Sequence, residues 1–392
     1  MNAIINTKLI MEDGIIWDGV LLYEGDKIVV ADWKDKVEIP KDAEIIDAEG
    51  LYTAPGLIDM HNHGCTEYWF YEDPKFVSEF FIKHGITTVL PTFYHIMSKK
   101  DMIEGAKKIK EASKSGAGRI MEGLYMEGPF MSLSGSSASQ IKWHGAITKE
   151  DYTDLIDSFG DMIKVWAIDP NRENIEEFMA YAKDHTPNAI FAHGHSKATY
   201  EQIKELKHYG VKVRTHLGDA GGPKGRAQGT PGAGGDEFAL YDPDMYAELI
   251  VDQSGIHVVP GLLRTILKMK GPERICLISD HTTCVNKGYK NSEADGIWYG
   301  PDLNYDDIGW LAGSLMTLDN GVRNVMTHSP WGLCQAIRMA TLTPAELLGI
   351  DHKVGSLKKG KLANLILIDD MVNVKKVILQ GETAVENGKL IL

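Results

Sequence analysis

The sequence predicts an α/β protein, built as a (β/α)8 TIM barrel with a small β-sandwich domain formed by both chain termini. Three observations predict this fold. Apolar, strand-like runs alternate with amphipathic stretches between about residue 55 and residue 350. Short alternating runs, divided by Gly, Asp and Pro turns, occupy both ends of the chain. The 392 residues, 43% of them hydrophobic, are too many for one ordinary core and fit a barrel with a small attachment.

The two chain ends are expected to share one domain. Near the N-terminus the alternating runs read AIINTKLIM and IIWDGVLLYEGDKIVVAD, and near the C-terminus they read KLANLILID and KKVILQGETAVENGKLIL. Such runs are typical of antiparallel strands. We therefore predict that residues 1–54 and 355–392 form a composite β-sandwich domain and that residues 55–354 form the barrel.

The barrel strands are expected where apolar runs meet polar residues or turns. In order, they are residues 57–64, 87–93, 120–128, 163–169, 189–196, 211–218, 255–260 and 274–280. The stretches between them include FVSEFFIKHG, MIEGAKKIKEASKSG, NIEEFMAYAKDH and TYEQIKELKHYG, several of which end at Gly as helices often do. In such a barrel the active site lies at the C-terminal ends of the strands.

The composition excludes several classes of partner. A formal net charge of −14 disfavours broad binding to nucleic acid or to an anionic membrane, so neither is expected as a partner. The four cysteines show no CxxC spacing, which argues against a zinc knuckle or a disulfide framework. No stretch approaches about 18 apolar residues, and Glu12 and Asp13 interrupt the N-terminus before a signal sequence forms. The expected location is the cytoplasm.

A pair of histidines ends the first expected barrel strand, PGLIDMHNHG. His61 and His63 are two residues apart, so both imidazoles face the same side of a strand, which suits a metal ion. Alone, such a pair is a weak signal. It gains weight because further candidate residues, each at the end of another expected strand, would meet it at the same rim of the barrel: Glu127, His195, His216 and Asp280.

Each of these residues also has a structural alternative. Glu127, in MEGPF, is a candidate ligand able to bridge two ions, or a cap of the next helix. In AHGHS, alternation does not decide between His193 and His195; His195 is preferred because it lies nearer the rim. His216, in RTHLGDA, is a ligand or a hydrogen-bonded core histidine.

The remaining candidates concern proton transfer and substrate contact. Asp280, in LISDHTT, follows an apolar run and would be costly to bury without a partner such as a metal-bound water. It could take the water's proton as general base and deliver it as general acid. For His257, in SGIHVVP, substrate contact and a core role are equally supported. Arg226, in a glycine-rich loop, either pairs with a phosphate or carboxylate or is a solvated charge.

These motifs together resemble the amidohydrolase superfamily, and most closely the N-acetylglucosamine-6-phosphate deacetylase family. The likeness lies in PGLIDMHNHG, MEGPF, GHSKATY, THLGDA, SGIHVVP, ISDHTT, LAGS and ATLTPAELLGIDHKVGSLKKGKLANLILID, which run in the family's order from residue 55 to residue 369. The resemblance implies hydrolysis of the acetamide on carbon 2 of an amino-sugar phosphate, by attack of a metal-bound hydroxide, to give acetate and the free amine.

The resemblance also implies roles for the candidate residues. Glu127, His195 and His216 would hold the principal divalent metal, zinc by preference or iron as the alternative, and Asp280 would be the acid/base. Some family members lack the first histidine pair and use one ion. His61 and His63 here permit a second ion, bridged through Glu127. The family borrows phosphate contacts from a neighbouring subunit, which implies a homodimer.

The chain departs from the family pattern around the substrate. It has THLGDAGG where the family reads THLFNAM or THLYNAM, so Asp219 and Ala220 stand where Asn-Ala helps to hold the sugar phosphate. The charge of Asp219 is unfavourable for a phosphate unless Arg226 or a neighbouring subunit compensates. The family's KGAH segment is replaced by KWHGAI, with His144 as the candidate for polarising the acetyl carbonyl. QSGIH keeps His257 but lacks the aspartate of the usual ADGxH.

Two rival functions remain open. The same site could act on a non-phosphorylated or different acylamino sugar, an N-acyl amino acid, a cyclic amide or a lactone, and the altered loop at Asp219 supports this. Alternatively, the chain could be a scaffold that has lost its chemistry. Retention of the full ligand set argues against a scaffold.

Overall fold

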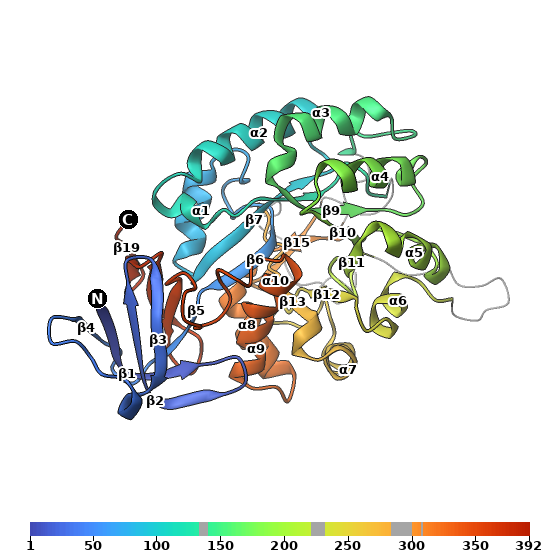
Figure 1. The fold of residues 1–392 in the computed structure, drawn as a ribbon. Coiled ribbons are helices and arrows are strands. Elements are labelled where there is room, and N and C mark those ends of the chain that lie inside the picture. Colours follow the sequence, from blue (N-terminus) through green and yellow to red (C-terminus); the bar gives the residue numbers. More distant parts are fainter. Residues whose placement is uncertain (133–139, 221–231, 284–299, 307–308) are drawn as a thin grey trace.

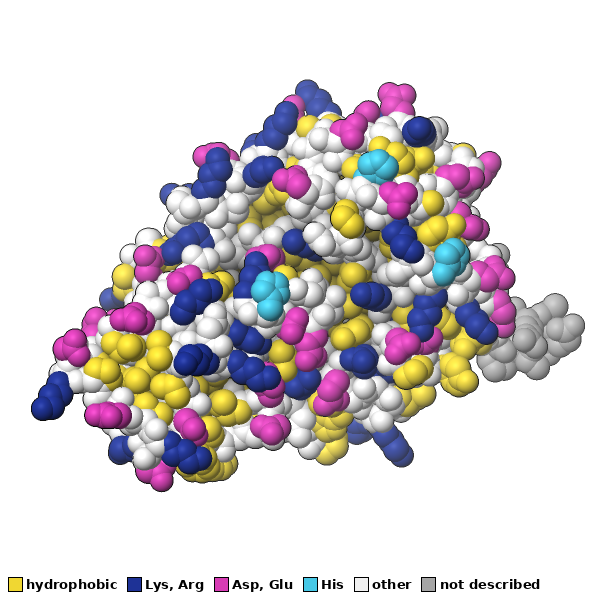
Figure 2. Space-filling model, in the orientation of Figure 1, with side chains coloured by type: hydrophobic (Ala, Val, Ile, Leu, Met, Phe, Trp, Pro, Cys, Tyr) yellow, Lys and Arg dark blue, Asp and Glu magenta, His cyan; other side chains and the backbone are white. Residues whose placement is uncertain are grey.

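The protein consists of a parallel barrel and a β-domain, which lie side by side (Figure 1). The structure is a computed structural model, and it describes residues 1–132, 140–220, 232–283, 300–306 and 309–392. Both termini lie in the β-domain, at the left of Figure 1. On the face shown in Figure 2, acidic and basic side chains are interspersed. That face therefore presents no broad basic surface of the kind that nucleic acid requires.

The β-domain is one hydrogen-bonded sheet made from both ends of the chain. The N-terminal half contributes β1 (Asn2–Ile10), β2 (Ile15–Glu24), β3 (Lys27–Trp33), β4 (Glu44–Asp47) and β5 (Tyr52–Pro55), with the short helix η1 (Lys34–Lys36) after β3. The C-terminal half contributes β16 (Leu365–Ile368), β17 (Val374–Leu379), β18 (Glu382–Glu386) and β19 (Lys389–Leu390). The halves join where β5 pairs with β16 in antiparallel fashion. A β-domain formed by both termini is thus confirmed, whereas its exact boundaries stay a prediction.

The barrel is formed by eight parallel strands that pair in sequence order, which confirms the predicted (β/α)8 architecture. They are β6 (Leu57–Asn62), β7 (Ile86–Tyr94), β8 (Leu124–Glu127), β9 (Ile163–Ile168), β10 (Ile190–His193), β11 (Val211–Arg214), β12 (Tyr246–Leu249) and β13 (Ile275–Leu277). The chain leaving β13 closes the barrel on β6, because the backbone N–H of Asp280 donates to the carbonyl of His61 at 3.0 Å.

Helices cover the outside of the barrel (Figure 1). They are α1 (Pro74–Ile82), α2 (Lys99–Ala112), α3 (Lys149–Phe159), α4 (Ile175–His185), α5 (Tyr200–Leu206), α6 (Gly235–Tyr241), α7 (Pro260–Lys270), α8 (Leu318–His328), α9 (Leu333–Met339) and α10 (Leu342–Leu347). Ser98, Thr148 and Thr199 start α2, α3 and α5 with capping boxes. None of the helices described here is long and apolar enough to cross a bilayer.

Shorter elements complete the fold. The 3-10 helices η2 (Gly116–Ile120), η4 (Gly160–Met162), η5 (Lys207–Tyr209) and η6 (Pro272–Arg274) precede barrel strands, and β14 (Leu303–Tyr305) pairs with β15 (Leu311–Ser314). The barrel interior is packed with apolar side chains such as Met60, Val165 and Val213. Because this interior is solid, reactive groups can gather only at its rim.

The seventh barrel strand differs from the prediction. It is β12, at Tyr246–Leu249, whereas residues 255–260 form a turn that leads into α7. Asp252 creates this turn by accepting the backbone N–H groups of Ile256 and His257. The true strand escaped detection because the buried Glu248 interrupts its apolar pattern. The other seven predicted strands overlap the observed ones.

The junction between the two halves of the β-domain should be sensitive to loss of volume. Ile366 on β16 is fully buried and pairs with Ala54 of β5, whereas Ile391 in the same domain is 57% exposed. Ile366→Ala is expected to lower the free energy of unfolding by about 2–5 kcal/mol, because it leaves a cavity. Ile391→Ala should change it by less than about 0.5 kcal/mol. Urea denaturation of both variants checks this, and equal effects would contradict the shared core.

Candidate metal centre

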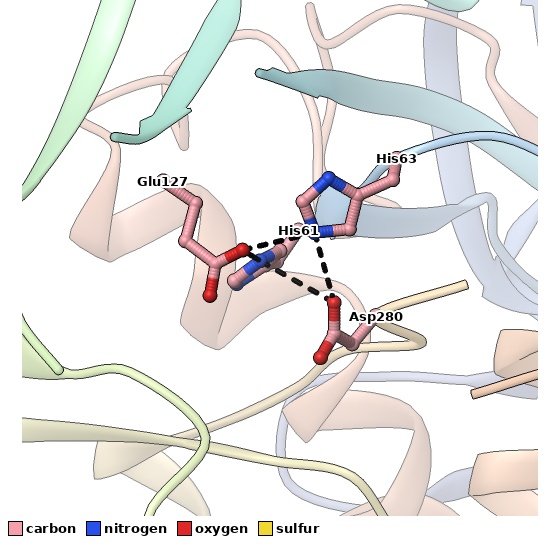
Figure 3. A group of neighbouring side chains, drawn as sticks. All are labelled: His61, His63, Glu127 and Asp280. Carbon is pink, nitrogen blue, oxygen red and sulfur yellow. Dashed lines mark ion pairs between the residues drawn. The ribbon is translucent and has the colours of Figure 1, made fainter. Parts of the chain in front are cut away.

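One group of four side chains gathers where the first and last barrel strands meet (Figure 3). His61 lies on β6, His63 follows that strand, Glu127 ends β8, and Asp280 follows β13. The Nε2 atom of His63 lies 3.0 Å from Glu127 Oε2 and 3.1 Å from Asp280 Oδ1. The Nε2 atom of His61 lies 3.5 Å from each of the same two oxygens. Two nitrogens and two oxygens thus converge on one point.

A second group shares Glu127 with the first. Its other oxygen, Oε1, lies 2.9 Å from His195 Nε2 and 3.1 Å from His216 Nε2. The two imidazole nitrogens are 3.0 Å apart. Glu127 therefore presents one oxygen to each pair of histidines, so both pairs lie within reach of the same carboxylate.

The backbone at this rim is strained. Asp280 has a φ of +47°, His195 of +44° and His216 of +31°, in a region that non-glycine residues rarely occupy. Each such conformation costs about 1–3 kcal/mol and persists only where the surroundings enforce it. Three strained residues at one rim are typical of a functional site rather than of a simple packing contact.

The histidines of the centre favour the ionised form of its two carboxylates. Burial alone would raise the pKa of Glu127, but the imidazoles of His61, His195 and His216 outweigh burial and hold that pKa well below its usual range. Burial also opposes ionisation of Asp280, and His61 and His63 nevertheless lower its pKa. Both carboxylates are therefore ionised at neutral pH and carry the negative charge that a divalent cation requires.

The donor set fits a metal ion. His61 Nε2 and Asp280 Oδ1 are buried and have no hydrogen-bond partner among the described residues. Buried polar atoms are rarely left so, and a cation held by this cluster would account for them. The opposite ring nitrogens are held: His61 Nδ1 lies 3.2 Å from Glu248 Oε2, and His63 Nδ1 lies 3.3 Å from the carbonyl of Thr92. Metal-binding histidines are usually oriented in this way.

A cavity of about 330 Å³ opens above the two groups. The aromatic rings of Trp69 and Tyr94 form part of its wall and meet the His63 ring edge to face, at 5.8 and 5.2 Å between centroids. The predicted substrate residues Asp219 and Ala220 also line it. Among its described lining residues there is no Lys or Arg, so the wall seen here is acidic.

His257 lies beside this cavity, in the loop after β12. Its Nδ1 lies 3.1 Å from Asp252 Oδ2, and its Nε2 lies 3.3 Å from the carbonyl of Gly313, a residue that lines the cavity. Burial disfavours the charged ring, but Asp252 and Asp219 raise the pKa of His257 above its ordinary value. QSGIH lacks the aspartate of ADGxH, and in this structure Asp252, five residues before His257, is the carboxylate that contacts its ring.

The other predicted residues lie outside the cluster. His144 is exposed and is not among the residues that line the cavity, so its position gives no support to a role in polarising the substrate. Arg226 falls in residues 221–231, outside the described residues. His193 lies on β10 with its ring against Gly235, and it belongs to neither group of clustered side chains. The predicted acid/base role of Asp280 stays a prediction, now with a shared geometry behind it. The same holds for the predicted metal roles of the other clustered residues, which are His61, His63, Glu127, His195 and His216.

Sequence reasoning missed several residues around the centre. Glu248, Tyr125, Trp69 and Tyr94 contact the histidines directly but carry no motif. The one available signal was the glutamate within the apolar run MYAELIV, because a charge inside such a run needs a partner.

The chain is similar to several known proteins along most of its length. The model of the amidohydrolase family matches residues 52–384. The N-acetylglucosamine-6-phosphate deacetylase of Haemophilus influenzae is 28% identical over 391 residues, which covers 97% of this chain and 98% of that protein. The N-acetylgalactosamine-6-phosphate deacetylase of Escherichia coli O157:H7 is 28% identical, covering 88% and 90%. The crystal structure of the Pasteurella multocida N-acetylglucosamine-6-phosphate deacetylase is similar, with a TM-score of 0.84, 27% identity and coverage of 97% and 99%.

The pair of Asp252 and His257 should make stability depend on pH. Burial opposes both charges, yet His257 lowers the pKa of Asp252, and Asp252 raises that of His257. The stabilisation is complete between about pH 4 and pH 6.5, and it is lost as pH rises through the raised pKa of His257 or falls through the lowered pKa of Asp252. Asp252→Asn should therefore destabilise the protein most within that window and lower the pKa of His257.

Denaturation at several pH values, together with NMR titration of His257, measures this effect. The exposed Asp370→Asn is the matched control and should leave the titration of His257 unchanged. An unaltered pKa of His257 in Asp252→Asn would show that the pair does not interact as described.

Proposed function

This chain belongs to the amidohydrolase family, and from that premise we propose that it removes the N-acetyl group from an amino-sugar phosphate of the N-acetylglucosamine-6-phosphate type. The products would be acetate and the free amino sugar. The observation that carries the proposal is Glu127, whose two oxygens each face a pair of histidines at the rim of the barrel. Full-length similarity to deacetylases of two acetamido-sugar phosphates supports the substrate class.

We propose two divalent ions, one in each group of ligands, with zinc preferred and iron as the alternative. Imidazole nitrogens and carboxylate oxygens suit both metals. His195 and His216 would hold one ion, His61, His63 and Asp280 the other, and Glu127 would contact both. When bound, such ions polarise a carbonyl group and lower the pKa of water to about 7.

The chain's own residues would then manage protons and orientation. Asp280 is buried, ionised and directed at the centre, so its carboxylate can accept a proton from water and pass it to the departing amine. Trp69 and Tyr94 would limit access of bulk water to the reacting amide. His257, beside the cavity wall, and the carbonyl of Gly313 would orient the sugar. His144 remains a candidate for polarising the acetyl group without geometric support.

A second substrate class is favoured by a specific observation. Asp219 lines the cavity, and its described wall has no Lys or Arg to receive a phosphate. A non-phosphorylated acetamido sugar would suit this wall without any compensation. The phosphorylated substrate instead requires a cation from Arg226 or from a neighbouring subunit, which is why we also propose a homodimer. Light scattering would measure that state directly.

A cytoplasmic location is supported by Cys65, Cys276 and Cys334, which are free thiols.

Loss of the proposed acid/base should abolish turnover without emptying the centre. Asp280→Asn keeps the size of the side chain but cannot accept the proton, so kcat is expected to fall by at least about 100-fold. The ion held by Glu127, His195 and His216 should remain, as elemental analysis would show. Asp302→Asn, a buried aspartate whose carboxylate bonds the backbone N–H of Gln253, is the control. Near-normal turnover in Asp280→Asn would rule out this role.

The charge at Asp219 should set the preference for a phosphate. N-acetylglucosamine-6-phosphate, its galactosamine epimer and their dephosphorylated forms should be compared by kcat/KM, with the phosphorylated pair expected to be better substrates. Asp219→Asn removes a like charge and should improve the phosphorylated over the dephosphorylated form by roughly tenfold. If wild-type protein prefers the dephosphorylated sugars, the second substrate class is correct instead.

A further inference from the structure

A fully buried carboxylate lies directly beneath the metal centre. Glu248 is on β12, and its side chain points into the interior of the barrel. The barrel interior is packed with apolar side chains, including Met60, Val213 and Cys276. A buried charge of this kind is retained only where a polar partner compensates it. None of the roles described above uses Glu248 as a ligand or as an acid/base.

Glu248 contacts the Nδ1 edge of the His61 ring. Its Oε2 lies 3.2 Å from His61 Nδ1, and the Tyr125 hydroxyl donates to the same oxygen at 3.4 Å. The Tyr125 ring also stacks on the His61 ring, with 4.3 Å between centroids and 27° between planes. His61 is thus held at one edge by Glu248 and on one face by Tyr125, while its Nε2 faces Glu127 and Asp280.

This contact fixes the tautomer of His61. Because a carboxylate only accepts hydrogen bonds, Nδ1 must carry the proton, and the lone pair of Nε2 is then free for a cation. Among the described residues, the hydrogen bond from Glu248 to the second pair of histidines is made with the backbone N–H of His216, at 3.4 Å, and not with a ring nitrogen. Its influence on a ring nitrogen is therefore confined to the His61 side.

We propose that Glu248 is a positioning residue that creates the metal subsite of His61 and His63, and so decides whether the centre holds two ions or one. The inference rests on the proposed two-ion function. Glu248 adds a third carboxylate to the surroundings of this subsite, after Glu127 and Asp280. The ion held by His195 and His216 does not depend on it.

Zinc titration of the metal-free protein tests this proposal. In Glu248→Leu the affinity for one ion should fall about 10–100-fold, as is usual when an outer partner of a ligand is lost, while the other affinity stays unchanged. In Glu248→Gln the affinity for this ion should fall less, because the amide oxygen still accepts a hydrogen bond from Nδ1. This variant replaces Glu248→Leu in the titration if Glu248→Leu does not fold. The matched control is Glu122→Gln, half-buried at the opposite end of the barrel and paired with Lys353.

The outcomes separate the two levels of the proposal. Calorimetry gives the two affinities, and elemental analysis after dialysis gives the ions retained per chain. Selective loss of one ion supports the role of Glu248, since a general structural defect would weaken both. Two ions bound with wild-type affinity in Glu248→Leu, or equal weakening of both, would overturn this inference alone. A wild-type protein that binds one ion would overturn the two-ion proposal itself, and this inference with it.

Discussion

The arrangement of the site depends on one carboxylate that two pairs of imidazoles must share. Glu127 is buried at the end of β8, where an isolated charge would be unfavourable. Its Oε2 faces His61 and His63, and its Oε1 faces His195 and His216. Those histidines come from strands on both sides of the barrel, so the charge is compensated only when the whole barrel has the correct register. The cluster of Glu127 and its histidines therefore forms only when the barrel itself has folded.

Closure of the barrel is the second part of this constraint. Asp59 on β6 accepts the backbone N–H of Ser279 at 3.1 Å and its hydroxyl at 2.6 Å, which ties the chain after β13 to the first strand. The next residue is Asp280, whose N–H bonds the carbonyl of His61. A slip of one residue would turn Asp280 away from the two histidines. The buried hydrogen bonds between Asp59 and Ser279 thus help to fix the position of Asp280 beside the two histidines.

The sequence predicted the site best where a potential metal ligand follows a regular apolar strand pattern. The spacing of His61 and His63, and the position of Glu127 after an apolar run, predicted their convergence because parallel strands end at one rim. The strand β12 was misplaced because Glu248 interrupts its apolar pattern. Hydrophobic periodicity identifies buried apolar residues, but it does not identify a buried charge whose partner lies on another strand. Asp252 was overlooked for a related reason. It precedes His257 by five residues, whereas the aspartate of ADGxH precedes its histidine by three, and only the folded turn brings Asp252 to the His257 ring.

The proposed metal ligands lie at strand ends, whereas the substrate cavity is lined largely by loops. Similarity to other proteins therefore predicts the reaction better than it predicts the substrate. The ligands stand on strand ends that every neighbour in the barrel constrains. The cavity wall comes from loops such as those bearing Trp69 and Asp219, which can change without disturbing the strands. An acidic wall and a phosphate are compatible only if a cation is brought to the same loops. Selection of the substrate is therefore a question of charge balance in the loops, whereas cleavage of the amide is a property of the barrel.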